Sequence, residues 1–340
     1  LILMLLLFSI SNPFVGAQTS NPNTVWSGTI NLPEGYTINS GESITVIAGT
    51  TIRLGDGQRL WVDGRISIHG ESQSGVILEI LGNGKHEGIN FNSSSLGFGS
   101  VIENLTIFDS TYGITIYGSD PLIINTTIIN PDRVGIDIFD FGNPRIIDLN
   151  ISDGGQDIHG TTTSWRYGIG ISVGFQSNIF IHNASISNLI TRGINLWGQA
   201  NGILRNVELT NISGSTLAGC AAIWVEDSFA IFENTSISKS DNGIISRSET
   251  GSWSNKPTFL RTTIENSLYR GVLVDKSNKS DYLQLGNSQA KFEDLTIRGT
   301  GGPLTKTPGL GINAFEVNTS SVILSGTNVI QNNPVVGFRG

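Results

Sequence analysis

Residues 113–138 read GITIYGSDPLIINTTIINPDRVGIDI, and they contain one full unit of a repeat that returns along most of the chain. The unit opens with Gly113-Ile114-Thr115-Ile116 and opens again in the same way with Gly135-Ile136-Asp137-Ile138. Between these two lies Asn125-Thr126-Thr127-Ile128, a second short alternating stretch that begins with a polar residue. Apolar residues at every second position are typical of a strand with one buried face. The unit therefore predicts short strands separated by tight turns.

The repeat extends far beyond this unit. The glycine-led motif recurs at Gly88, Gly168, Gly193 and Gly271, and the polar-led motif recurs at Asn104, Asp148, Asn183, Asn206, Asn234, Arg261 and Asp294. The shortest spacings between successive polar residues are 21 and 23. A period of ~20–50 residues indicates a solenoid, and the pieces are too closely spaced for helical crossovers, which need ~10–12 residues or more.

We therefore predict an all-β fold, a single parallel β-helix of about 12 coils stacked at the spacing of paired strands. The aligned isoleucines would form a continuous aliphatic core. The recurring asparagines would stack as a ladder in a tight turn, with their amides buried and bonded to one another. The leading glycines would occupy a corner where φ is positive and no Cβ fits.

Composition excludes several other classes of protein. The chain has 340 residues, of which only 14% are charged and 42 are glycine. A disordered chain or a coiled coil needs more charge than this, and the glycines lack the three-residue period of collagen. The net charge of −8 without a Lys/Arg cluster argues against a nucleic-acid partner. Cys220 is the only cysteine, so no internal disulfide and no cysteine-based metal site is expected.

The N-terminus predicts export. Residues 1–10 form an apolar run too short to span a bilayer, and Val15 and Ala17 suit a signal cleavage site. We predict a signal peptide over residues 1–17 with a truncated start; the alternative is a buried N-terminal helix. Residues 18–340 would form the β-helix domain, incomplete at the C-terminus, in a longer secreted or cell-surface protein.

The repeats resemble the right-handed parallel β-helix superfamily of pectin lyase-like proteins, which includes pectate lyases, polygalacturonases and many surface proteins. The resemblance covers roughly residues 25–338, and residues 44–70 are similar to a motif common in secreted β-helix surface proteins. One solenoid carries many functions. The resemblance therefore implies a fold, and it leaves open whether the chain is an enzyme.

Hydrolases of this superfamily use clustered Asp residues, a Gly-His-Gly step and a basic clamp. Here Ile169 replaces the His and no two Asp residues are adjacent, which argues against hydrolysis. Lyases of the superfamily use Ca²⁺ held by carboxylates and an Arg base, although no specific calcium motif occurs here and we predict no metal site. The resemblance implies these catalytic candidates: Asp137, Asp140, Arg133, Asp157 and His159. The alternative is that the carboxylates are merely solvated loop residues.

Strand alternation also predicts a ligand surface, because residues between inward-facing isoleucines face outward. Exposed aromatic rings beside carboxylates and amides suit sugars, which offer an apolar face and a rim of hydroxyls. The candidate ligand-binding residues are Tyr117, Asp137, Phe139, Asn195, Trp197, Trp224 and Glu226. The insert over residues 152–167 brings Trp165, Arg166 and Tyr167 near the Asp137 coil. The alternative is that inserted loops cover the rings.

In an exported protein, Asn92, Asn278 and Asn318 are the candidate glycosylation sites, because they lie in loops and start Asn-x-Ser/Thr sequences. We predict a non-catalytic secreted or cell-surface β-helix protein for adhesion or contact with polysaccharide or envelope glycan. One alternative is a polysaccharide lyase or glycoside hydrolase acting on acidic glycans. A second alternative is an architectural spacer in a larger surface protein.

Overall fold

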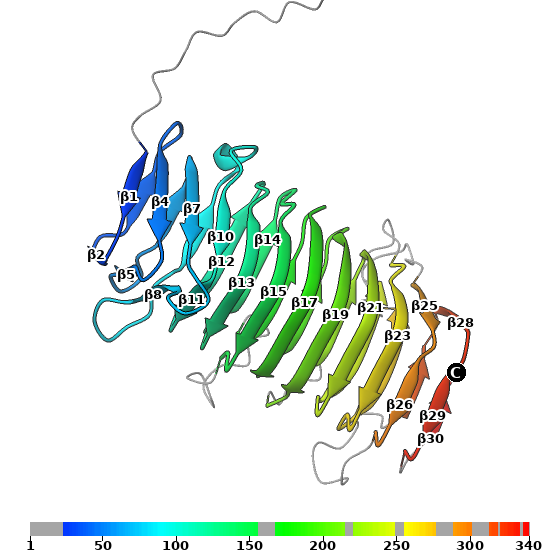
Figure 1. The fold of residues 1–340 in the computed structure, drawn as a ribbon. Coiled ribbons are helices and arrows are strands. Elements are labelled where there is room, and N and C mark those ends of the chain that lie inside the picture. The colour runs from blue at the N-terminus through cyan, green and yellow to red at the C-terminus, as the bar shows by residue number, and fades with distance from the viewer. Residues whose placement is uncertain are drawn as a thin grey trace, which may run out of the picture.

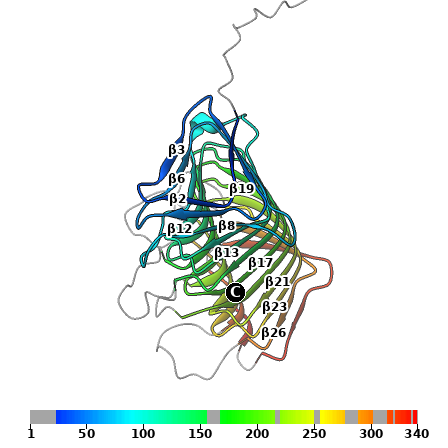
Figure 2. The ribbon, with the colours of Figure 1, turned by 60° about the vertical axis from the view of Figure 1, so that its left-hand side comes forward.

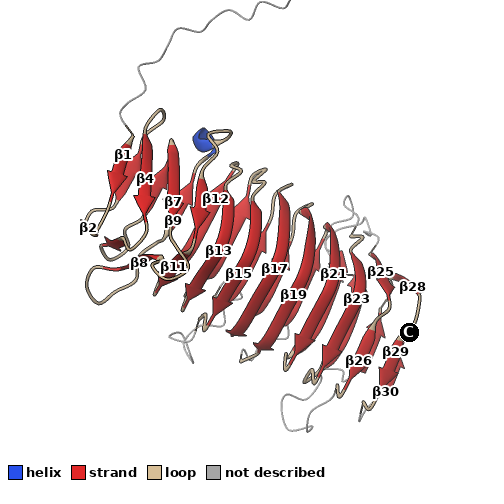
Figure 3. Ribbon diagram, in the orientation of Figure 1, coloured by secondary structure: helices blue, strands red, loops and turns tan. Residues whose placement is uncertain are grey.

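The computed structural model describes residues 23–155, 167–214, 220–248, 255–276, 288–300, 313–318, 320–333 and 336–339. These segments wind into an elongated rod of stacked coils, with successive coils running in the same direction (Figure 1). Strands dominate the described chain, and one short 3₁₀ turn, η1 (Ser93–Ser95), lies between two of them (Figure 3). The predicted all-β, parallel β-helix fold is confirmed.

One face of the rod is a parallel sheet that we call sheet 1. It has 12 strands in the described chain, each paired with the equivalent strand of the next coil. Its strands are β3 (Tyr36–Ile38), β6 (Leu60–Val62), β9 (Ile89–Phe91), β12 (Tyr112–Tyr117), β14 (Val134–Phe139), β16 (Ile169–Val173), β18 (Arg192–Leu196), β20 (Ala221–Glu226), β22 (Asn242–Ser248), β24 (Arg270–Lys276), β27 (Asn313–Val317) and β30 (Val336–Arg339).

The other two faces, sheets 2 and 3, are separate in the first coils. Sheet 2 starts with β1 (Thr24–Trp26), β4 (Ser43–Ile47), β7 (Arg65–His69) and β10 (Val101–Glu103), and sheet 3 with β2 (Thr29–Leu32), β5 (Thr51–Leu54), β8 (Val76–Ile80) and β11 (Leu105–Phe108). A view turned by 60° shows the flat faces enclosing one interior (Figure 2).

Later coils join the two faces in one long bent strand. These strands are β13 (Leu122–Ile129), β15 (Arg145–Ser152), β17 (Asn178–Leu189), β19 (Asn201–Ile212), β21 (Phe229–Ser238) and β23 (Thr258–Glu265). The faces separate again in β25 (Gln289–Glu293), β26 (Thr296–Arg298), β28 (Ser321–Ser325) and β29 (Val329–Gln331).

The core is a set of stacked side-chain columns. Ile114 pairs with Ile136 and Ile136 pairs with Ile171, and all three are fully buried. In this coil the predicted register was off by two residues, because Ile169 pairs with Val134 instead. The glycine that leads the motif in this coil is therefore Gly170. The sequence could not decide between Gly168 and Gly170, because both precede an isoleucine.

Toward the C-terminal end the core becomes aromatic. Phe232, Phe259 and Phe292 stack in successive coils with ring centroids 4.8 and 5.0 Å apart and planes 10° from parallel. Offset or parallel contact of buried rings adds to the energy of burying their area. The interior of the rod is thus filled by columns of the same residue type, isoleucine in the middle coils and phenylalanine toward the C-terminal end.

The leading glycines do sit at a corner, but the expected positive φ is wrong for most of them. At Gly135 the φ angle is negative, and a Cβ there would lie 2.7 Å from the carbonyl oxygen of Gly170 and 2.8 Å from Cδ1 of Ile151. Glycine is required because neighbouring coils and the core approach too closely. These glycines also interrupt the alternation, so that the residue before each of them faces outward.

The predicted asparagine ladder lies at the bend between sheets 2 and 3. The Nδ2 of Asn206 donates to Oδ1 of Asn183 at 3.0 Å, the Nδ2 of Asn234 donates to Oδ1 of Asn206 at 3.1 Å, and Nε of Arg261 donates to Asn234 at 2.6 Å. These residues have φ between 53° and 61°, a region that Asn tolerates better than most residues. The expected burial of the amides is wrong, because they lie on the outside of the bend, half to fully exposed.

A second ladder, which the sequence analysis missed, lies one turn further along each coil. There the Nδ2 of Asn211 donates to Asn188 at 3.0 Å, and the Nδ2 of Asn188 donates to Asp153 at 2.9 Å. Asn130 donates to Asp109 at 2.8 Å in the same way. The side chains again replace backbone hydrogen bonds that the turn cannot make.

Candidate functional site

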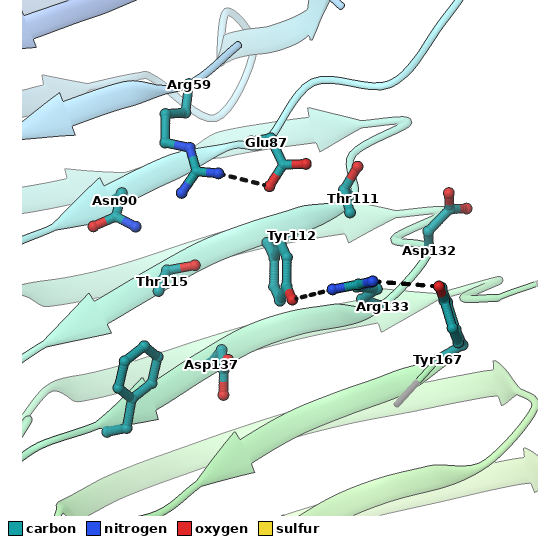
Figure 4. Close-up of a pocket in the computed structure, with 11 residues that line it drawn as sticks. Arg59, Glu87, Asn90, Thr111, Tyr112, Thr115, Asp132, Arg133, Asp137 and Tyr167 are labelled. Carbon is teal, nitrogen blue, oxygen red and sulfur yellow. Dashed lines mark hydrogen bonds and ion pairs between the residues drawn. The ribbon is translucent and has the colours of Figure 1, made fainter. Parts of the chain in front are cut away.

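A groove of about 580 Å³ lies on the outer face of sheet 1, over the coils of β9, β12 and β14 (Figure 4). Its lining is mostly polar and comes from strands and from the turns that precede them. The lining residues are Arg59, Glu87, Asn90, Thr111, Tyr112, Thr115, Asp132, Arg133, Asp137, Phe139 and Tyr167.

Strand register builds the floor of the groove. Asn90 pairs with Thr115, Thr115 pairs with Asp137, and Asp137 pairs with Ser172, so four polar side chains form one outward column across adjacent coils. Tyr112 joins them because the glycine after it interrupts the alternation. Without that interruption Tyr112 would point into the core, along with Ile114 and Ile116.

Asp137 is a groove carboxylate with a raised pKa. Burial raises the pKa of its carboxyl from 3.8 to about 6, and a hydrogen bond from Ser172 opposes part of that rise. Ser172 in turn accepts a hydrogen bond from Nε1 of Trp197 at 3.4 Å. The carboxylate is therefore poised to gain or lose a proton close to neutral pH, a property of general bases.

Arg133 is fixed between two tyrosines. Its guanidinium donates to the hydroxyl of Tyr112 at 3.0 Å and to the hydroxyl of Tyr167 at 3.3 Å, and it lies over both rings (Figure 4). These contacts raise the pKa of Arg133 above its usual value. The groove thus holds a permanent cation with two phenol hydroxyls beside it.

The other lining carboxylates are already neutralised. Glu87 accepts from Arg59 at 3.0 Å, and Asp132 lies 2.9 Å from the ammonium of Lys85. No ion pair joins Asp137 to any described residue. Asp137 is therefore the carboxylate of this groove whose proton can move without breaking an ion pair.

Next to the groove runs an exposed row of aromatic residues. Tyr117 and Phe139 form an edge-on pair with centroids 5.0 Å apart, and Phe175 and Trp197 form another at 4.4 Å. Phe141 is 68% exposed and Phe175 is 48% exposed. The backbone N–H of Phe141 donates to the backbone carbonyl of Phe175. Both phenylalanines have positive φ, a costly conformation for bulky residues that suggests a functional constraint.

The C-terminal half of sheet 1 is covered on its outer face. Asn195 is only 2% exposed and Trp224 only 5%, so neither is open to a ligand here. Arg192 stacks on the Trp224 ring at 3.9 Å from its centroid and donates to Asn195 at 2.6 Å. Nε1 of Trp224 donates to Glu226 at 3.0 Å. These predicted ligand residues face outward but belong to a packed cluster.

The remaining predicted residues fall in three groups. Asp140 is not part of the groove lining; it accepts a hydrogen bond from Tyr117, which raises the pKa of that phenol. Asp157, His159 and Asn278 lie outside the described residues, as do Trp165 and Arg166. Asn92 and Asn318 are half-buried, and their amides donate to Asp63 and Glu316.

Within the described segments, no group of three or more His, Cys, Asp or Glu side chains comes together to hold a metal ion. The described part of the groove therefore does not fit the carboxylate set that calcium prefers. In those same segments no helix has the length and hydrophobicity needed to cross a membrane.

Of the residues named from the sequence, Asp137, Arg133, Phe139 and the nearby Tyr167 all line this groove. Sequence reasoning missed Tyr112, whose outward orientation depends on the interrupted alternation. Asn90 and Thr115 were also missed. Counting back from Asp137 in the strand register would have found them, because they share its column.

Comparison with known proteins returns structures but no sequence relatives. No family model and no curated protein matches the chain. An alginate lyase from Paenibacillus sp. str. FPU-7 is similar, with a TM-score of 0.50 and 14% identity over 88% of this chain and 98% of that one. The catalytic domain of a GH87 α-1,3-glucanase in complex with nigerose has a TM-score of 0.50 and 12% identity over 94% and 71%. The periplasmic alginate epimerase AlgG has a TM-score of 0.48 and 15% identity over 91% and 70%.

At such identities the likeness concerns the fold. The chain has the fold of a right-handed parallel β-helix, as the resemblance of its repeats implied. The similar structures come from enzymes of polysaccharides.

Proposed function

We propose that the chain binds acidic polysaccharides in the groove of sheet 1 and cleaves them by β-elimination. The observation that carries the proposal is Asp137, a half-buried carboxylate with a raised pKa and no ion pair to a described residue, in one groove with Arg133. The proposal reverses the preference for a non-catalytic role that the sequence alone favoured. The polysaccharide enzymes among the similar folds support this choice only in general terms.

Elimination suits the groove better than hydrolysis. Glycoside hydrolases place two carboxyl groups on either side of the scissile bond. Here Glu87 and Asp132 are held by Arg59 and Lys85, which leaves one carboxylate available among the described lining residues. Elimination from a uronic acid needs one base, one acid and a cation for the substrate's own carboxylate, and the groove contains each of these.

The proposed step moves two protons. Asp137 takes the proton from the ring carbon next to the uronate carboxylate, and a carbon–carbon double bond forms as the bond to the glycosidic oxygen breaks. Arg133 stabilises the charge that builds on the uronate carboxylate. The hydroxyl of Tyr112 donates a proton to the leaving oxygen, and solvent later restores both residues.

The test is the ultraviolet absorbance of the unsaturated product after incubation with polygalacturonate or alginate. We expect absorbance to rise with the wild-type chain, faster as the pH passes about 6, and to fall by ~100-fold or more with Asp137→Asn. Glu208→Gln, an exposed carboxylate on sheet 3, serves as the matched control and should keep full activity. New reducing ends without absorbance would indicate hydrolysis and overturn the proposal.

A second candidate is glycan contact without cleavage, which the exposed row of Tyr117, Phe141 and Phe175 favours. It predicts that polysaccharide binds without any product and that Asp137→Asn binds as tightly as wild type. Binding of no polysaccharide at all would favour the architectural spacer.

We also propose that the protein acts outside the cytoplasm. Residues 1–17 match a secretory leader and lie outside the described residues, and large acidic polysaccharides are extracellular materials. N-terminal sequencing of exported protein should start at Gln18, and retention of residues 1–17 would contradict the proposal.

A further inference from the structure

We propose that Asn90 marks a second sugar subsite in the groove, where it binds a hydroxyl group of the polysaccharide two coils away from Asp137. This inference rests on the proposed function, because it takes the occupant of the groove to be a glycan chain. It also specifies the direction of the bound polysaccharide, which would lie along the axis of the rod. Asn90 would then select which sugar binds at the end of the groove farthest from Asp137.

The starting observation is an unpaired polar group. Asn90 is only 7% exposed and lines the groove in the same row as Thr115 and Asp137 (Figure 4). Its Oδ1 is buried and has no hydrogen-bond partner among the residues that the structure describes. Nearly all buried polar groups in native proteins form hydrogen bonds, because burial removes their hydrogen bonds to water and an unpaired group has nothing to offset that loss. A groove residue left in this state points to a partner that arrives with the ligand.

Asn195 provides an internal comparison. It occupies the same outward column of sheet 1, in the covered half of the rod, and it is equally buried. There the guanidinium of Arg192 donates to Oδ1 of Asn195 at 2.6 Å. The covered asparagine therefore has a partner within the chain, whereas no described residue pairs with the same atom of the groove asparagine.

A hydroxyl is the group that fits Asn90 best. The amide has an acceptor oxygen and a donor nitrogen, and rotation about its last bond exchanges them. A sugar hydroxyl both donates and accepts, so it satisfies either orientation. A carboxylate or sulfate carries no proton for Oδ1. The subsite is thus expected to prefer a neutral hydroxyl edge.

Register gives the length of ligand required. Asn90 and Asp137 are separated by the coil of Thr115, and at ~4.8 Å per coil this separation is about 10 Å. A single sugar over Asp137 therefore does not reach Asn90. Only an oligomer that continues along the rod toward β9 contacts both residues.

The experiment compares Asn90→Leu with Asn195→Leu. Dimers and hexamers of galacturonate and of alginate are titrated by calorimetry, in an Asp137→Asn background that prevents turnover, and urea unfolding is followed without ligand. We expect Asn90→Leu to weaken hexamer binding about three- to tenfold, the worth of one hydrogen bond, and to leave dimer binding unchanged.

The unfolding arm separates a binding role from a structural one. Replacing the amide of Asn90, whose Oδ1 has no partner among the described residues, should raise the urea midpoint. Asn195→Leu should lower it, because the hydrogen bond from Arg192 to Oδ1 of Asn195 is lost. Equal loss for dimers and hexamers, or a fall in the midpoint with Asn90→Leu, would overturn the subsite. Normal turnover by wild type with unchanged hexamer binding by Asn90→Leu would overturn the subsite alone. Failure of wild type to bind either oligomer would overturn the proposed function together with it.

Discussion

Asp137 should destabilise the folded protein in the pH range where it is ionised. Its carboxyl has a pKa of about 6 in the folded chain, against an ordinary value of 3.8 in the unfolded chain. Below the lower value the carboxyl is protonated in both the folded and unfolded chains, and it has no effect on stability. As the pH rises, the unfolded chain ionises first, so the free energy of unfolding falls until the folded carboxyl has ionised as well. At about 1.36 kcal/mol for each pKa unit, the full loss is about 3 kcal/mol.

The assay is urea unfolding of wild type and Asp137→Asn between about pH 3 and about pH 7.5, a range that spans both pKa values. We expect Asp137→Asn to gain stability relative to wild type as the pH rises, by about 3 kcal/mol over this range. Glu208→Gln, at an exposed position of sheet 3, is the control. The difference in free energy of unfolding between this variant and wild type should not change with pH. If Asp137→Asn is less stable than wild type at pH 7.5, the carboxylate is a structural anchor, and the reasoning from its burial is wrong.

Three further predictions concern the rod. His86 is buried with both ring nitrogens hydrogen-bonded to backbone, and burial lowers its pKa to about 4. The stability of wild type relative to His86→Gln should therefore fall by about 3 kcal/mol as the pH drops from 6.5 toward 4, since Asp137 affects both proteins alike; a difference that does not change with pH in thermal melting would refute this. Gly135→Ala should cost roughly 1–3 kcal/mol in urea unfolding, because its Cβ would lie 2.7 Å from the oxygen of Gly170; an unchanged midpoint would contradict the close approach. Phe259→Ala should cost about 3–5 kcal/mol by thermal melting, against less than ~0.5 kcal/mol for the exposed Phe175→Ala; equal losses would show that the aromatic stack contributes nothing special.

The fold was predictable because each coil repeats the same sequence pattern. The stacking of Ile114 on Ile136 follows directly from residues that recur at a fixed period. Register failed at Gly168, where two glycines two residues apart each precede an isoleucine, and only the contact of Gly170 with the next coil decides between them.

The site was less predictable, because its residues depend on contacts between coils. Alternation places Trp197 and Trp224 equally outward, yet Trp224 is buried under Arg192 while Trp197 remains half-exposed. Tyr112 enters the groove only because glycine interrupts the strand. Which outward residues remain open is decided by what packs over them, and no local pattern carries that information.

Parallel pairing from one coil to the next also determines how the chain can assemble itself. Strand partners lie between 20 residues apart, as for Thr24 and Ile44, and 43 apart, as for Arg270 and Asn313. This separation is roughly a tenth of the chain, a value more usual for helical bundles than for β-proteins. The loop that must close for each new coil is the same size however many coils already exist. Once two neighbouring coils have formed, folding should therefore elongate coil by coil at a nearly constant rate, as in other repeat proteins.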